Sequence, residues 1–90
     1  MKINVKAISE AIKRNNEEFA VIPNKFEIED IEYVETVENG YGRDNVRQTI
    51  NIFMVHVSFK AKKYEHNKAQ YKIWYYEKDK EACANFYGTH

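Results

Sequence analysis

The segment QTINIFMVHVSF, Gln48 to Phe59, decides the fold, because it carries no formal charge in a chain that is 31% charged. Read with the period-two alternation of a β-strand, it is apolar on both faces. One face holds Phe53, Val55, Val57 and Phe59, and the other holds Ile50, Ile52 and Met54. Such a strand belongs in the middle of a sheet, and each of its two faces needs a cover.

Length and composition predict one domain over residues 1–90, near the lower limit for a chain that folds without disulfides or metals. A single cysteine, Cys83, excludes an internal disulfide and argues against a small secreted scaffold. Charges interrupt the apolar positions of the first 19 residues, and no apolar run approaches the roughly 18 residues of a membrane span. The sequence therefore predicts a cytoplasmic protein with no membrane contact.

Two segments precede the central strand. Residues 4–19 have apolar side chains at helical spacing (Val5, Ile8, Ala11, Ile12, Phe19), and Asn4 is a candidate N-cap. Residues 26–38, FEIEDIEYVETVE, alternate like a strand, but the apolar phase switches between Ile28 and Ile31. One β-bulge near Glu29 and Asp30 would return these apolar residues and Val37 to a single face. The opposite face is almost wholly acidic, which is typical of an edge strand.

The remaining elements complete an antiparallel sheet. The glycine-containing stretch ENGYGRDN predicts a hairpin loop with Tyr41 at its tip. The central strand is expected from about residue 46 to 61 and a third strand over residues 71–78, YKIWYYEK. The tail from Asp79 could form a short helix or a fourth strand. The fold class is thus α+β: an N-terminal helix packed on a three-stranded antiparallel meander sheet, with a short C-terminal helix or fourth strand.

The helix covers the sheet face that holds Phe53, Val55, Val57 and Phe59, and the opposite face is left for another cover. The tail, a second copy of the chain or a foreign protein could each provide it. Trp and Tyr are favoured anchors of protein interfaces, and an exposed loop offers a further contact. The predicted partner-binding residues are Ile50, Ile52, Met54, Trp74, Tyr76 and Tyr41.

Nucleic-acid binding is the alternative. Residues 72–78 alternate lysines with the rings of Trp74 and Tyr76, as single-strand binders do. The lysines assigned to this alternative are Lys72, Lys78, Lys60, Lys62 and Lys63. Residues 1–42 carry a net charge of −4 and residues 43–80 one of +5, but the whole chain is neutral. A neutral chain argues against a large phosphate contact.

No set of residues predicts catalysis, a metal site or a cofactor. His56, His66 and His90 are not spaced as ligands with one another or with Cys83, and no glycine-rich phosphate loop is present. The function predicted is a non-enzymatic binding module that forms a homodimer through a self-complementary patch. It would act by protein–protein contact as an inhibitor or adaptor. Eleven Lys against three Arg, with nine Asn and nine Ile, indicate AT-rich codons, as in a low-GC bacterium or in a phage or mobile element living in one. An anti-defence inhibitor is one example of such a binding module.

Overall fold

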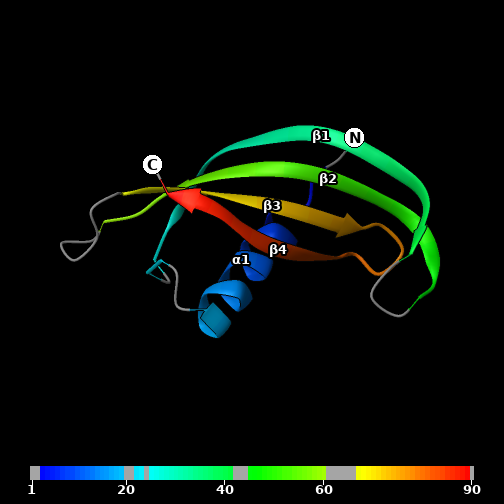
Figure 1. Ribbon diagram of the computed structural model, residues 1–90, viewed down its shortest axis with the longest axis horizontal. Helices are drawn as coiled ribbons and strands as arrows, with labels where there is room; N and C mark the ends of the chain where they lie inside the picture. Colours follow the sequence, from blue (N-terminus) through cyan, green and yellow to red (C-terminus); the bar gives the residue numbers. More distant parts are fainter. Residues whose placement is uncertain (1–2, 20–21, 24, 42–44, 61–66, 90) are drawn as a thin grey trace.

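The computed structural model describes residues 3–19, 22–23, 25–41, 45–60 and 67–89. One helix precedes a four-stranded antiparallel sheet with the strand order β1-β2-β3-β4. The elements are α1 (Val5–Phe19), β1 (Glu27–Tyr41), β2 (Arg47–Ser58), β3 (Lys68–Tyr76) and β4 (Glu81–Thr89). The strands arch over α1, which packs mainly against β4 and β3 (Figure 1). The predicted α+β class with an antiparallel sheet is confirmed.

The C-terminal segment corrects the finer prediction of a three-stranded sheet with an added terminal element. Residues 81–89 form β4, which pairs with β3 in the same sheet, so this segment does not fold beneath the uncovered face. Asp79 caps no helix; it lies in the turn between β3 and β4, where its Oδ2 accepts a hydrogen bond from Gln48 Nε2 at 3.1 Å. The β4 backbone gains a ladder of hydrogen bonds along β3, which a one-turn helix could not match.

Helix α1 begins as its sequence predicts. The Asn4 Oδ1 atom accepts a hydrogen bond from the Ala7 backbone N–H at 3.1 Å, so Asn4 is the N-cap. The buried stripe is shifted from the predicted one. Its members are Ala7, Ile8, Ala11, Ile12, Asn15 and Asn16, whereas Val5 and Phe19 are exposed. The shift follows from the position of α1 under β3 and β4, which turns the two ends of the predicted stripe away from the sheet. No described helix is long and apolar enough to cross a membrane.

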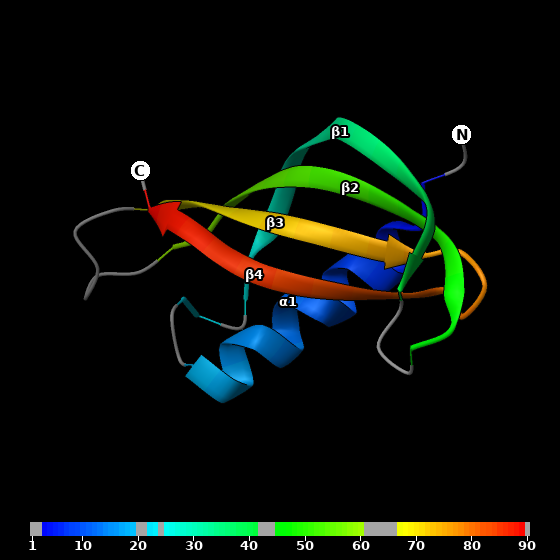
Figure 2. The same ribbon diagram turned by 45° about the vertical axis from the view of Figure 1, so that its right-hand side comes forward.

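Strand β1 lies at the edge of the sheet, as predicted from its acidic face, and it is irregular. The predicted bulge is present between Ile28 and Asp30. Two further register shifts follow, between Tyr33 and Glu35 and between Val37 and Gly40. The shift between Tyr33 and Glu35 moves Val37 to the face opposite α1, where it pairs with Ile50. The predicted place of Val37 on the same face as Ile31 is therefore wrong. Bulges bend and twist a strand, and Figure 2 shows β1 curving sharply over β2.

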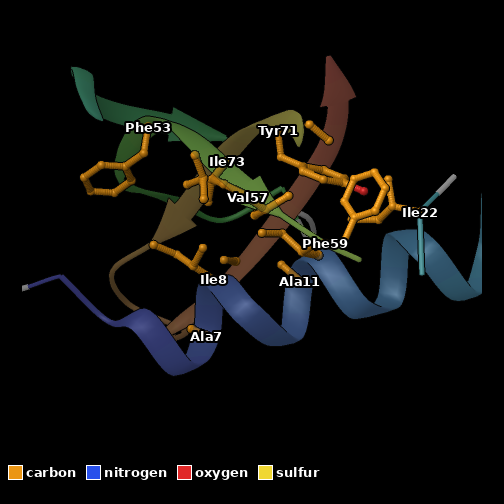
Figure 3. Packing of buried hydrophobic residues seen from close by; sticks show 13 residues of the cluster. Ala7, Ile8, Ala11, Ile22, Phe53, Val57, Phe59, Tyr71 and Ile73 are labelled. Carbon is orange, nitrogen blue, oxygen red and sulfur yellow. The ribbon is translucent and has the colours of Figure 1, made fainter. Parts of the chain in front are cut away.

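The core lies between α1 and the concave side of the sheet (Figure 3). Each strand contributes alternate residues to it, as the period of two requires. Phe53, Val55, Val57 and Phe59 of the central segment are all buried there, together with Tyr71 and Ile73 of β3. The predicted division of the central strand into two faces is therefore confirmed for the face that α1 covers.

The outer edge of β4 is protected by side chains of the helix. Arg14 Nη2 donates a hydrogen bond to the Ala82 carbonyl oxygen at 2.7 Å, and Asn15 Nδ2 donates one to the Ala84 carbonyl oxygen at 3.1 Å. Free carbonyl groups on an edge strand invite pairing with another chain. The two edges of this sheet are thus protected differently, β4 by hydrogen bonds from α1 and β1 by bulges and carboxylates.

Tyr71 places a hydroxyl in this core. Its side chain is fully buried, and the hydroxyl donates a hydrogen bond of 2.6 Å to Asn16 Oδ1. The Asn16 Nδ2 atom is also buried and has no hydrogen-bond partner among the described residues. Burial raises the pKa of the Tyr71 phenol from 10.0 to about 12, because a phenolate cannot be hydrated there.

We expect Tyr71→Phe to lower the free energy of unfolding by about 1–3 kcal/mol at neutral pH, since the Asn16 amide is left unpaired. A folded-state pKa above the unfolded value means that the native state holds its proton longer. The resulting stability is complete below pH 10 and is lost as the pH rises towards 12. Between pH 9 and pH 11.5, urea titrations should therefore show the free energy of unfolding of the wild type falling by about 2 kcal/mol more than that of Tyr71→Phe. Equal losses in the two proteins would contradict the assignment to Tyr71.

Candidate protein-binding face

The side of the sheet that points away from α1, called the convex face here, gathers most of the predicted partner-binding residues. Register places Ile52 of β2 opposite Trp74 of β3, and Ile50 opposite Tyr76. Met54 follows on the same face, opposite Lys72. Five of the six predicted residues therefore form one continuous patch over two adjacent strands.

Side chains of the patch shield one another. Ile50 and Ile52 are each only 6% exposed, although no described helix or strand lies over this face (Figure 1). Half-buried neighbours flank them across the strands: Trp74 pairs with Ile52, Tyr76 and Val37 pair with Ile50, and Met54 follows Ile52 on the same face. The accessible part of the patch consequently consists of a thioether and two aromatic rings. These are the side-chain types that protein interfaces favour at their centre.

A row of carboxylates borders the patch along β1. From the sequence alone, these acidic residues indicate an edge strand and no more. Cross-strand pairing sets Asp30 beside His56, Glu32 beside Met54 and Glu35 beside Ile52. All three carboxylate residues are exposed. The alternation of β1 already predicts this arrangement. Its apolar residues face the core, so its acidic residues must lie on the same face of the sheet as Ile50, Ile52 and Met54. The acidic row is thus part of the same surface as the apolar patch.

The polar end of the convex face is held by contacts between β1 and β2. His56 Nε2 lies 3.8 Å from Glu32 Oε2, a distance that forms an ion pair when the imidazole is protonated. Ser58 Oγ donates a hydrogen bond of 2.6 Å to Glu29 Oε1. His56 therefore stands at the rim of the patch.

Tyr41 does not join this surface. It ends β1 opposite Arg47, and Gly40 rather than Tyr41 faces the Ile50 side chain. The Tyr41 ring is 61% exposed, with the Arg47 guanidinium carbon 4.9 Å from its centre. Arg47 Nη2 also donates a hydrogen bond of 2.8 Å to the Tyr41 hydroxyl. Tyr41 is consequently a separate exposed ring, held by its hairpin partner.

The lysines of the nucleic-acid alternative do not form one line. Lys72 is on the convex face, where its Nζ lies 5.2 Å from the centre of the Trp74 ring. Lys78 lies in the turn after β3, and Lys60 lies beyond the end of β2. These two flank opposite ends of β3, whose nine residues span about 30 Å. Lys62 and Lys63 lie outside the described residues.

The described parts of the chain contain no group of three or more His, Cys, Asp or Glu side chains placed to hold a metal ion. Cys83 is half-buried on β4, where it pairs with Trp74 on the convex face; it does not pack in the core beside Phe86. No protein-family model matches the chain, and comparisons with curated proteins and with solved structures find no match either.

Proposed function

We propose that the protein is a non-enzymatic binding module whose convex face docks a foreign protein, as an inhibitor or adaptor does. The observation that carries the proposal is the patch of Met54, Trp74 and Tyr76, which lies over buried isoleucines on a face without a described covering element. Apolar surface that a fold leaves uncovered marks an interaction site in small proteins. A cytoplasmic role against host defence, for a phage or mobile element, is the biological setting that we propose for it.

The charges beside the patch specify the kind of partner. Asp30, Glu32 and Glu35 form a negative border, so a complementary surface carries Lys or Arg beside an apolar contact. A second copy of the chain matches poorly. With a two-fold axis parallel to the strands, β1 would face β4, which offers Glu81, Cys83 and Asn85. With the axis across the strands, β1 would face β1 of the other copy, and carboxylates would oppose carboxylates. We therefore favour a foreign basic partner over the homodimer that the sequence suggested.

Nucleic acid is the weaker candidate for the same face. The Lys72 ammonium already lies over the Trp74 ring, where a stacked base would have to displace it. The neighbouring carboxylates Glu32 and Glu35 would also repel phosphates. Binding of this kind would weaken steeply as the salt concentration rises.

Trp74→Ala tests the proposal. The immobilised chain is used to capture proteins from a lysate of a low-GC bacterium, and the affinity of the purified partner is then measured. A central aromatic anchor contributes 2 kcal/mol or more to binding, so we expect Trp74→Ala to weaken the complex about 30-fold or more. The variant should retain the circular dichroism of the wild type, because the concave-side core is unchanged.

Tyr33→Ala is the matched control, because it removes an exposed ring from the concave side of β1. We expect this variant to bind the partner as wild type does. A folded Trp74→Ala protein with undiminished affinity would contradict the proposal. Sedimentation of the wild type tests whether a second copy of the chain occupies the convex face. If the wild type is a dimer and Trp74→Ala is a monomer, the partner is a second copy.

A further inference from the structure

A second surface lies in a cavity between α1 and the end of the sheet where β2 ends and β3 begins. The cavity measures about 730 Å³, within the range of small-molecule sites. It is lined from three directions. Ser9 and Lys13 come from α1, Lys25 and Phe26 precede β1, and the ends of β2 and β3 supply Phe59, Lys60 and Lys68.

Four exposed lysines therefore line one space. None of Lys13, Lys25, Lys60 and Lys68 has a hydrogen bond or ion pair to another described residue. Two carboxylates, Glu27 and Glu29, also line the cavity and leave its walls with a net charge of +2. Glu29 Oε1 accepts the hydrogen bond from Ser58 Oγ within the same lining. The positive charges outnumber the negative ones and repel one another, and a bound polyanion would relieve that repulsion.

Apolar side chains in the same cavity indicate which kind of anion it would bind. The Phe26 side chain is half-buried against the core, and Phe59 is buried beside it in the lining. A ring at the wall of a basic cavity offers a stacking surface for a nucleobase. Ser9 and Asn67 add groups that hydrogen-bond to phosphate or sugar oxygens.

We propose that this cavity binds a nucleoside phosphate, with the phosphates among the four lysines and the base against Phe26. The ligand chemistry could come from a free nucleotide or from the 5′-phosphorylated end of a single strand. The proposal is independent of the protein-binding role of the convex face, since none of Met54, Trp74 and Tyr76 lines the cavity. It also differs from the nucleic-acid alternative considered above, in which the lysines of residues 72–78 make the contacts.

Amide NMR titration with ATP, without magnesium, tests the proposal. We expect saturable shifts concentrated at Ser9, Lys13, Phe26 and Lys60. The double variant Lys25→Gln/Lys60→Gln should weaken ATP binding at least tenfold, roughly the loss of one or two charge-assisted contacts. Lys72→Gln/Lys78→Gln removes the same charge outside the cavity, and it should change the affinity by less than about twofold because exposed charges are screened over about 10 Å.

Oligothymidylates with and without a 5′-phosphate distinguish the two sources. Preference for the phosphorylated strand, lost in Lys25→Gln/Lys60→Gln, would support a strand end as the ligand. Binding of ATP alone would support a free nucleotide. The absence of saturable ATP and phosphorylated-strand binding would overturn the proposal. Equal losses in the two double variants would overturn it as well, because they would show a general charge effect.

Discussion

Val55→Asp is expected to abolish the folded state. Val55 is 0% exposed and lies in the middle of the central strand, between Ile31 of β1 and Tyr71 of β3. The new carboxylate would have no partner in this apolar environment. Burying an unpaired charge costs more than about 4 kcal/mol, a large part of the 5–15 kcal/mol that stabilises a typical domain. Circular dichroism at pH 7 should show an unfolded chain.

Gln70→Asp is the matched control for this experiment. It places the same charge on the convex face, where Gln70 pairs with His56 and is half-buried. Water and the imidazole both stabilise a carboxylate there, so we expect a change of less than about 1 kcal/mol. A Val55→Asp protein with native circular dichroism and a cooperative urea transition would show that water reaches this site. The packing described for the concave side would then be wrong.

Phe53→Ala is expected to lower the free energy of unfolding by about 3–5 kcal/mol, the usual range for a fully buried ring. Phe53 is 1% exposed, and the Tyr33 ring packs against it edge to face, with 6.0 Å between the ring centres and 65° between the planes. Removal of the Phe53 ring leaves a cavity, and β1 would have to move towards β2 to fill it. Urea denaturation with unchanged slope and a lower midpoint is the measurement.

A double-mutant cycle separates the aromatic contact from the burial. Tyr33 is 51% exposed, so Tyr33→Ala alone should cost no more than about 1.5 kcal/mol. The two substitutions together should cost less than their sum by about 0.5–1.5 kcal/mol, the coupling of an edge-to-face pair. Strict additivity would show that the rings do not interact. A cost for Phe53→Ala below about 1 kcal/mol would show that the ring is not buried.

The two proposed sites use different parts of one sheet. The convex face presents Met54, Trp74 and Tyr76 beside carboxylates, and the cavity presents lysines beside phenylalanines. A basic protein and an anionic ligand are therefore directed to separate surfaces by charge alone. Because the variants Trp74→Ala and Lys25→Gln/Lys60→Gln share no residue, either proposal can fail while the other stands.

Local patterns in the sequence predict a large part of the fold. The N-cap at Asn4, the bulge after Ile28, the edge position of β1 and the central position of β2 are all present as predicted. Each depends on a signal within a few residues: a side-chain acceptor before a helix, a switch of apolar phase, a row of acids, or a double-sided apolar run. The sequence also predicts that most of the candidate residues share one face, because Ile50, Ile52 and Met54 alternate along β2. Register then pairs Ile50 with Tyr76 and Ile52 with Trp74.

The prediction is left open, or is wrong, where several elements compete for the same residues. The sequence leaves the tail as a short helix or a fourth strand, and the free edge of β3 decides for the strand, because it gives residues 81–89 more backbone hydrogen bonds. The second bulge, after Tyr33, reverses the side of Val37, and no switch of apolar phase in the sequence marks it. Tyr41 stays a separate predicted contact, and register with Arg47 places it on the side of β1 opposite to the patch.

By itself, the sequence determined that a double-sided apolar strand lies in the middle of an antiparallel sheet with an amphipathic helix on one face. This followed because burial of an uncharged segment requires neighbours on both sides and a cover. Only the tertiary structure decided that the cover of the second face is not the tail, and that four lysines from α1 and three other segments meet around one cavity. The reason is physical: pairing partners and convergent side chains are set by contacts between residues distant in the chain, which no local period encodes.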